Sequence, residues 1–211
     1  SGIKFSPCPE NTTLDCGTLN VPVDYHKPYG EHVGIAVIRA RATNPAKRIG
    51  VVVGNPGGPG ISGVDFVLNG INVPAFARLR ERFDVISFDP RGVGRSRPVR
   101  CAADFPDPPA DFDTADDETL ATYFDEAGKA FAKACFEQNG SWVTKLGTNN
   151  VARDIDLLRR ALGEKQITYA AGSYGSELGA TYASLFPERL RAMMLDGTAT
   201  PIHRDYFVEF V

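Results

Sequence analysis

Short apolar runs and helix-spaced apolar positions take turns along most of the chain. Residues 18–25 and 31–43 alternate or run apolar with many β-branched side chains, which predicts an edge hairpin. Two later runs, residues 48–60 and 83–92, are predicted to be buried strands that end in glycine or a sharp turn. Residues 165–173 are predicted as a further strand, and residues 189–197 as the last one.

Apolar residues at helical spacing lie between these runs. Short helices are predicted at 64–69 and 74–82, and a longer one at 174–186, which Pro187 closes. Two further helices are indicated by sets of residues spaced three or four apart. These sets are Leu120, Phe124, Ala127, Phe131 and Cys135, and then Val151, Ile155, Leu158 and Leu162, which follow the capping candidates Thr148, Asn149 and Asn150.

The alternation of strands and helices predicts an α/β fold. Its central sheet is expected to be mostly parallel, with helices on both faces. The chain has 211 residues, which suits one domain. Ligands of such sheets bind beyond the carboxyl ends of the strands, and the glycine-rich corners of this chain lie at those ends.

Charge and composition exclude some functions. The net charge is −3 and no basic stripe is present, which argues against a nucleic-acid partner. No apolar run approaches the length of a membrane span. Residues 101–118 carry seven acidic residues and no Lys or Arg. We interpret this segment as a solvent-exposed loop rather than a site for a cationic substrate.

The four cysteines allow three pairings. The simplest is local, Cys8 with Cys16 and Cys101 with Cys135, and it implies an oxidising compartment. Four free thiols in a reducing compartment are the alternative. No spacing typical of a metal site is present, so no metal or cofactor is expected.

Ser173 lies at a tight corner between the predicted strand at 165–173 and the following helix. The local sequence A-G-S-Y-G differs from the nucleophile-elbow signature G-x-S-x-G by Ala171 at the first glycine. An elbow places the serine hydroxyl at the N-terminus of a helix, where backbone N–H groups face developing negative charge. The N–H of Tyr174 is therefore one natural oxyanion donor.

A second donor must come from another loop. Residues 54–60 read GNPGGPG, and Gly57 and Gly58 would let a substrate carbonyl approach the backbone closely. An ordinary turn or a phosphate loop are the alternatives. A phosphate loop is disfavoured because no lysine follows, as the P-loop pattern requires. The glycine loop and the elbow, in this order, together favour acyl transfer.

The stretches GNPGGPGISGVDFV, FDVISFDPRGVGRSRPVRC, NNVARDIDLLRRALG and SYGSELGATYASLFPERLRAMMLDG resemble a known family. It is the secreted tripeptidyl aminopeptidase and proline-iminopeptidase-like family of the α/β-hydrolase fold. The resemblance runs from about Cys8 to Pro201. It implies a secreted serine hydrolase that removes short peptides from substrates with a free N-terminus, and the local disulfides fit that family.

The resemblance also implies residue roles. Ser173 is the nucleophile, and the backbone N–H groups of Gly58 and Tyr174 form the oxyanion hole, with Gly57 as a further candidate. Asp89 and Arg91 look catalytic, but in this fold their turn is interpreted as a hydrogen-bonded scaffold. Trp142 and the Phe and Tyr side chains are expected to belong to the core rather than to a substrate cage.

The general base is not evident in this chain. The triad order of this fold is Ser, then an acid, then His. His26 and His32 precede every catalytic loop. Asp196 and His203 are in the right order, but Asp196 is expected to be a turn residue and His203 to lie in an insertion.

Relatives are expected to continue here into a lid, two more strands, the acid and the histidine. Residues 1–200 are thus expected to be the N-terminal part of the hydrolase domain, and 201–211 the start of the lid. Either a precursor is cut and its halves stay associated, or the chain is truncated. A second polypeptide from the same precursor is expected to complete the sheet and the triad.

Three functions remain open. The favoured one is a secreted serine aminopeptidase that acts through an acyl-enzyme. An esterase or lactone hydrolase on the same scaffold is the second, because the elbow fixes acyl transfer and not the leaving group. The third is a non-catalytic binding subunit that lacks the base.

Overall fold

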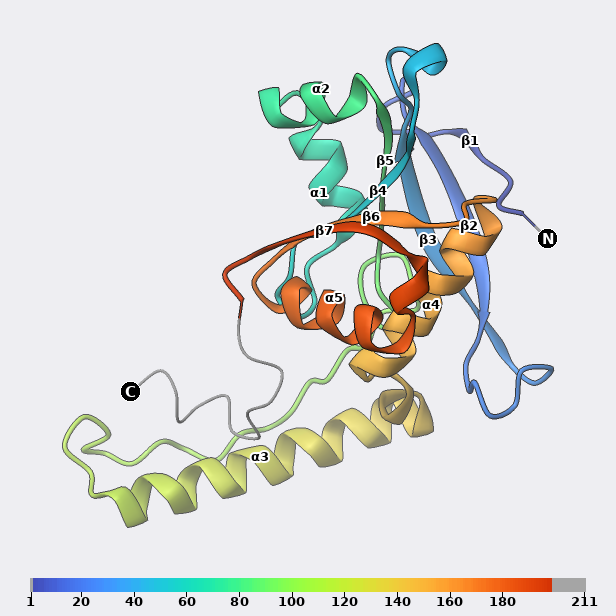
Figure 1. Cartoon of the computed structure of the whole chain (residues 1–211). Helices are drawn as coiled ribbons and strands as arrows, with labels where there is room; N and C mark the ends of the chain where they lie inside the picture. Colours follow the sequence, from blue (N-terminus) through green and yellow to red (C-terminus); the bar gives the residue numbers. More distant parts are fainter. Residues whose placement is uncertain (1, 199–211) are drawn as a thin grey trace.

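A seven-stranded sheet organises residues 2–198, the part of the chain that this computed structural model describes. The strand order is β1-β2-β3-β5-β4-β6-β7 (Figure 1). Strands β5, β4, β6 and β7 run parallel to one another, and β3 joins them antiparallel through β5. The strands are β1 Ser6–Pro7, β2 Asp15–Pro22, β3 His32–Ala40, β4 Gly50–Asn55, β5 Phe83–Phe88, β6 Ile167–Gly172 and β7 Leu190–Asp196.

Helices cover both faces of the sheet, as predicted. Helices α1 (Gly63–Gly70) and α2 (Pro74–Arg80) lie on one face, and α4 (Thr148–Ala161) and α5 (Tyr174–Leu185) on the other (Figure 1). Each face has its own apolar cluster of buried side chains, one with α1 and one with α4 and α5. The α/β fold with a mostly parallel sheet is therefore confirmed.

The hairpin of β2 and β3 forms one side of the sheet. Its register pairs Leu19 with Ile35 and Val21 with Val33, all buried, so one face of the hairpin enters the core. The disulfide Cys8–Cys16 fastens the chain before β2 to this strand. The hairpin predicted from residues 18–25 and 31–43 is thus present, with only the two-residue β1 outside it.

Strand β7 is the opposite edge of the described sheet. It pairs on one side with β6, from Ile167↔Leu190 to Gly172↔Asp196. Five of its seven residues are exposed. An exposed edge strand presents unpaired backbone groups that another strand can bind.

Helix α3 (Asp117–Asn139) stands apart from the sheet, and the disulfide Cys101–Cys135 ties it to the loop before it (Figure 1). None of its 23 residues is buried. Trp142, in the 3-10 helix η2 (Gly140–Lys145), is buried as expected. We call α3 and the loop before it, residues 101–139, the arm. The prediction that the Phe side chains belong to the core is wrong for the arm, because its loop and helix pack on each other rather than on the sheet. The exposed ones are Phe105, Phe112, Phe124, Phe131 and Phe136.

Helix α4 begins one residue earlier than its capping candidates predict. Its N-cap is Gly147, with no side-chain hydrogen bond, and Thr148 is the first helical residue. The Thr148 hydroxyl instead lies 2.9 Å from the phenol oxygen of Tyr174. A tertiary contact beside Ser173 has replaced the local cap.

Candidate active site

Ser173 sits at a strained corner between β6 and α5. Its backbone has φ 51° and ψ −131°, and only one other described non-glycine residue, Arg97, has a positive φ. L-residues avoid this region, and strain of this kind is concentrated at functional sites. The strand-to-helix corner with a positive φ at the serine is the geometry of a nucleophile elbow.

Backbone hydrogen bonds hold the elbow in place. The N–H of Ser173 donates to the carbonyl oxygen of Asp196 at 2.9 Å, which joins the elbow to the end of β7. The carbonyl oxygen of Ser173 accepts from both the N–H and the Oγ of Ser176, at 2.8 and 2.6 Å. Asp196 therefore serves the elbow through its backbone as the last residue of β7. Its proposed partner His203 lies outside the described residues.

Small residues allow the close packing around the serine. A Cβ on Gly175 would lie 2.7 Å from Oδ1 of Asn55, and one on Gly179 would lie 2.6 Å from the ring of Tyr169. Both distances are shorter than real Cβ atoms show, so α5 can approach β4 and β6 only with glycine at these positions. Helix α5 is thereby held with its N-terminus at the carboxyl edge of the sheet.

Tyr174 contributes both a backbone donor and a side-chain anchor. Its N–H belongs to the first residue of α5, where the helix has no internal acceptor for it. Burial, and after it the nearby charge of Glu177, raises the pKa of the Tyr174 phenol, so it stays protonated at neutral pH. The protonated phenol binds Thr148 at the start of α4, and this contact fixes the residue next to the serine.

The glycine loop lies directly against the elbow. Gly57 has φ 97°, and a Cβ there would lie 2.6 Å from the carbonyl oxygen of Gly172 and 3.0 Å from Cβ of Ser173. Its N–H donates to Oδ1 of Asn55 at 2.9 Å, so this donor is already occupied. Gly58 has φ 109°, and neither its N–H nor that of Tyr174 donates to another residue within 2–198. Gly58 and Tyr174 are thus the better candidates for an oxyanion hole.

Asn55 is a site residue that the sequence analysis missed. Its buried side chain accepts the Gly57 N–H two residues ahead, which is an Asx turn, and it packs under Gly175. The sequence does contain a signal for this turn, because Asn two residues before Gly at the end of a strand is typical of an Asx turn. Asn55 therefore shapes the loop and the elbow together.

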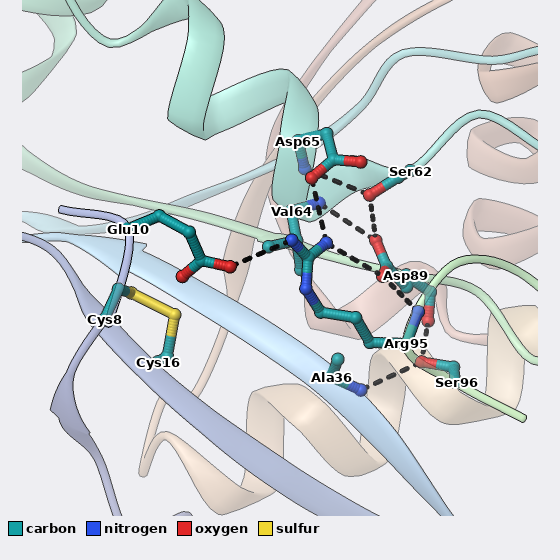
Figure 2. Close-up of polar contacts among 10 residues, drawn as sticks. All are labelled: Cys8, Glu10, Cys16, Ala36, Ser62, Val64, Asp65, Asp89, Arg95 and Ser96. Carbon is teal, nitrogen blue, oxygen red and sulfur yellow. Dashed lines mark hydrogen bonds and ion pairs between the residues drawn. A yellow bond between two sulfur atoms is a disulfide. The ribbon is translucent and has the colours of Figure 1, made fainter.

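Asp89 is a scaffold residue, as Figure 2 shows. Its fully buried carboxylate accepts hydrogen bonds from Ser62 Oγ at 2.5 Å, from the Val64 N–H at 3.1 Å and from the Arg95 N–H at 2.8 Å. The backbone carbonyl oxygen of Asp89 accepts from Ser96 Oγ, which in turn accepts from the Ala36 N–H (Figure 2). The Asp89 N–H donates to the Ala36 carbonyl oxygen. These contacts join the turn after β5 to the start of α1, which follows the glycine loop. These hydrogen bonds fit the interpretation of Asp89 as a scaffold residue.

Arg91 is buried in a structural ion pair with Asp154 of α4. Two guanidinium nitrogens donate to the two carboxylate oxygens at 2.7 and 2.6 Å, and both side chains are completely buried. Tyr25 donates to the same carboxylate at 2.6 Å. The structural interpretation of Arg91 fits these contacts. Asp154 was missed, although an acid between Val151 and Leu158 on an apolar helix face is a visible signal of a buried partner.

An apolar cavity of about 320 Å³ opens beside the elbow, between β4, β6, β7 and the α1–α2 pair. Gly172, Ala171 and Pro56 form its edge nearest Ser173, and Phe66 and Met194 are among its larger lining residues. An apolar group next to a reacting carbonyl would find a matching surface here.

The two described histidines lie away from Ser173. His32 is at the start of β3, three strand spacings from β6, which is about 14 Å. Its Nδ1 lies 2.8 Å from the carbonyl oxygen of Gly30, in the hairpin turn that also contains His26. Residues 2–198 thus contain no histidine placed to activate the serine.

Within residues 2–198, no group of three His, Cys, Asp or Glu side chains is arranged to hold a metal ion. None of the helices in that range combines the length and apolarity needed to cross a bilayer.

The fold and the elbow define an α/β hydrolase. Residues 50–210 match the family described as alpha/beta hydrolase fold, and the chain belongs to that family. The solved structure of VrEH2 superposes with a TM-score of 0.52 at 14% identity, over 92% of this chain and 41% of that chain, which supports the fold alone.

Three curated relatives are more similar in sequence. A tripeptidyl aminopeptidase of Streptomyces lividans is 37% identical over 95% of this chain and 39% of its own length. The serine protease Hip1 of Mycobacterium tuberculosis is 43% identical over 88% and 36% of the two chains. Carboxylesterase B of the same species is 42% identical over 91% and 37%. The chain therefore spans between 36% and 39% of the length of these relatives.

Proposed function

We propose that the protein is a serine hydrolase with Ser173 as its nucleophile. The observation that carries the proposal is the strained backbone of Ser173, φ 51° and ψ −131°, at the N-terminus of α5 and in contact with Gly57. Backbone strain of this kind persists only where the surrounding structure holds it, and such residues are concentrated at functional sites. The relationship to a protein named a serine protease supports the same chemistry.

The reaction follows from the elbow. The Oγ of Ser173 attacks the substrate carbonyl carbon, and its proton passes to a histidine base. The resulting oxyanion accepts hydrogen bonds from the N–H groups of Gly58 and Tyr174. Collapse of the intermediate expels the amine or alcohol, which takes the proton from the histidine. Water then attacks the acyl-enzyme by the same route and regenerates Ser173.

The histidine and its acid are proposed to come from polypeptide outside residues 2–198. Two observations support this: neither described histidine lies near Ser173, and the chain spans less than two fifths of the relatives it matches. The exposed edge of β7 is a natural place for further strands. A second polypeptide cut from the same precursor would supply these parts through a large apolar interface.

An aminopeptidase acting on free N-termini is the preferred activity, because a relative carries the name tripeptidyl aminopeptidase. The test compares the release of an anilide from a tripeptide with a free amine and from the same peptide acetylated at that amine. The proposal predicts hydrolysis of the free peptide and a large loss on acetylation. Equal rates on the two peptides would contradict an aminopeptidase and leave a general hydrolase.

An esterase is the second candidate, because another relative of similar identity is named a carboxylesterase. Nitrophenyl esters of short acids distinguish the two activities when they are compared with peptide anilides in the same preparation. An esterase would turn over the ester and leave every anilide intact. A protein that hydrolyses neither substrate, and whose Ser173 resists acylation, would instead be a binding subunit.

Secretion is part of the proposal. The structure contains two disulfides, Cys8–Cys16 and Cys101–Cys135, which is the local pairing that the sequence favours. Disulfides persist in oxidising compartments, so both bonds support an extracytoplasmic location. Finding the native protein in the medium or the cell envelope, with all four cysteines oxidised, is the expected result.

A further inference from the structure

Strand β5 contacts the beginning of the loop that joins β4 to α1. This loop consists of residues 56–62. The Oγ of Ser87, the penultimate residue of β5, is fully buried and donates to the carbonyl oxygen of Gly54 at 2.8 Å. The backbone pairing of β4 with β5 ends at Val53↔Ile86. The Ser87 side chain therefore extends the contact between the two strands to the residue where the chain begins to leave β4.

The end of the same loop is held from just beyond β5. The carboxylate of Asp89 accepts from the Oγ of Ser62 at 2.5 Å and from the N–H of Val64 at 3.1 Å (Figure 2). Ser62 is also the N-cap of α1, where its Oγ accepts the Asp65 N–H at 3.0 Å. A hydroxyl group can donate one hydrogen bond and accept others at the same time. The Ser62 hydroxyl thus joins the turn after β5 to the last residue of the loop and the first turn of α1.

Glycine allows α1 to lie directly on the end of β5. A Cβ on Gly63, the first residue of α1, would overlap the carbonyl oxygen of Phe88 and the Oγ of Ser87. Only a residue without a side chain fits at this position. The first residue of the helix therefore has a fixed place against the strand, and β5 holds the loop at both of its ends.

The middle of the loop lies against the nucleophile. A Cβ on Gly57 would lie 3.0 Å from the Cβ of Ser173, and Gly58, the proposed oxyanion donor, comes next in the chain. Such a donor stabilises the transition state only if it is fixed beforehand at about 2.7–3.1 Å from the place where the oxyanion forms. A displacement of about 1 Å can cost about 10²-fold in rate. The rate should therefore depend on how firmly the loop ends are held.

We propose that Ser62 and Ser87 are positioning residues for the oxyanion hole. Each ties one end of the glycine loop to β5, Ser62 through Asp89 and Ser87 through Gly54. Their role rests on the proposed hydrolase function and on Gly58 as a donor. The oxyanion exists in the tetrahedral intermediate and not in the bound substrate. Loss of either tie should therefore lower kcat and leave KM nearly unchanged.

The test compares Ser62→Ala with Ser62→Thr in the full-length protein, on whichever substrate the wild type hydrolyses, the peptide anilide or the nitrophenyl ester. Rates are expressed per Ser173 that a fluorophosphonate labels at completion, so that unfolded protein does not count. In Ser62→Ala, kcat should fall about ten- to a hundredfold. Threonine keeps the hydroxyl and is also a good N-cap, so Ser62→Thr should recover most of the rate. Ser87→Ala should reproduce the loss from the other end of the loop.

A transition-state analogue separates positioning from a general effect on folding. A trifluoromethyl ketone forms a tetrahedral adduct with a serine nucleophile, and this adduct carries an oxyanion. Its inhibition constant should rise in Ser62→Ala and Ser87→Ala by the same factor by which kcat/KM falls. A residue that only stabilises the fold would leave this constant unchanged when it is measured on the folded, labelled fraction.

The matched control is Asp116→Ala. Asp116 caps α3 by accepting the Thr119 N–H at 2.7 Å, as Ser62 caps α1, but α3 stands apart from the sheet (Figure 1). Its substitution should leave kcat, KM and the inhibition constant unchanged. Unchanged kcat in Ser62→Ala or Ser87→Ala would remove that residue from the positioning role. An equal loss in Asp116→Ala, or a loss explained by a higher KM, would overturn the proposal. A wild type that hydrolyses neither substrate and resists labelling would instead contradict the hydrolase function itself, and the positioning role with it.

Discussion

Ala171 and Gly175 fit together across the elbow. A Cβ built on Gly175 would lie 2.9 Å from the Cβ of Ala171, so the methyl group of one residue occupies the space that the other leaves open. The usual elbow signature has glycine at both positions. Here alanine is accommodated at the first position because glycine remains at the second, and the departure from the signature does not disturb the corner.

Gly175→Ala should therefore destabilise the protein. The new methyl group would meet Asn55 Oδ1 at 2.7 Å and the Asn55 carbonyl oxygen at 2.8 Å, besides Ala171. Overpacking of this kind costs about 1–3 kcal/mol of unfolding free energy. Thermal unfolding measures the loss. Gly172→Ala is the control, because a Cβ there has only ordinary contacts at 3.9 Å and beyond, and equal melting temperatures would contradict this packing.

Gly58→Val should lower turnover with little change in substrate affinity. A side chain at Gly58 would meet the backbone nitrogens of Gly60 and Ile61 at 2.8 and 3.1 Å and so displace the Gly58 donor, and loss of one oxyanion donor costs about 10²–10³ in kcat. Gly60→Ala is the matched control, since Gly60 also has a positive φ of 101° but open space around it. Similar kcat values for the two variants would remove Gly58 from the oxyanion hole.

The contacts of Asp15 should make the free energy of unfolding depend on pH. Burial alone raises its pKa, but hydrogen bonds from Arg41 and Arg39 outweigh burial and hold the pKa below its ordinary 3.8. The stabilisation is therefore present above the unfolded pKa and lost as pH falls through the folded one. Asp15→Asn should be less stable than the wild type at pH 7, and the difference in unfolding free energy should vanish in acid.

The control for that measurement is Asp113→Asn in the exposed loop. It should follow the wild-type stability at every pH. A constant difference between Asp15→Asn and the wild type from pH 7 down to pH 2 would show that the arginine contacts do not stabilise the ionised carboxylate.

The Arg91–Asp154 pair should behave as a unit. Arg91→Met leaves the Asp154 carboxylate buried without its cation, and breaking such a pair costs about 3–5 kcal/mol. Asp154→Leu alone should be similarly harmful, since Arg91 then loses two bonds. The double variant should recover part of the lost unfolding free energy. If the double variant lost the sum of the two single losses in unfolding free energy, the two residues would not depend on each other.

Much of the fold could be predicted from the sequence. The strands at 50–55, 83–88, 167–172 and 190–196 and the helices beside them follow the period of the apolar residues. Their order is enough for a mostly parallel sheet, because strand–helix–strand units can connect compactly in few ways. The serine corner followed from small residues at fixed offsets from Ser173.

Long-range contacts could not be predicted in the same way. Thr148 has the local features of a helix cap, yet its hydroxyl binds Tyr174, 26 residues later. Phe124 and Phe131 have the spacing of core residues, yet they are exposed on α3, which stands apart from the sheet (Figure 1). Periodicity shows that a helix has an apolar face, but not what that face meets.

The central claim is that Ser173 is a nucleophile. The most direct measurement treats the native protein with a fluorophosphonate and maps the modified peptide by mass spectrometry, with Ser173→Ala and the exposed Ser184→Ala on the same helix as comparison. We predict one adduct, on Ser173, which disappears in Ser173→Ala and persists in Ser184→Ala. An unmodified Ser173 in a preparation that hydrolyses its substrate, or full activity in Ser173→Ala, would contradict the account.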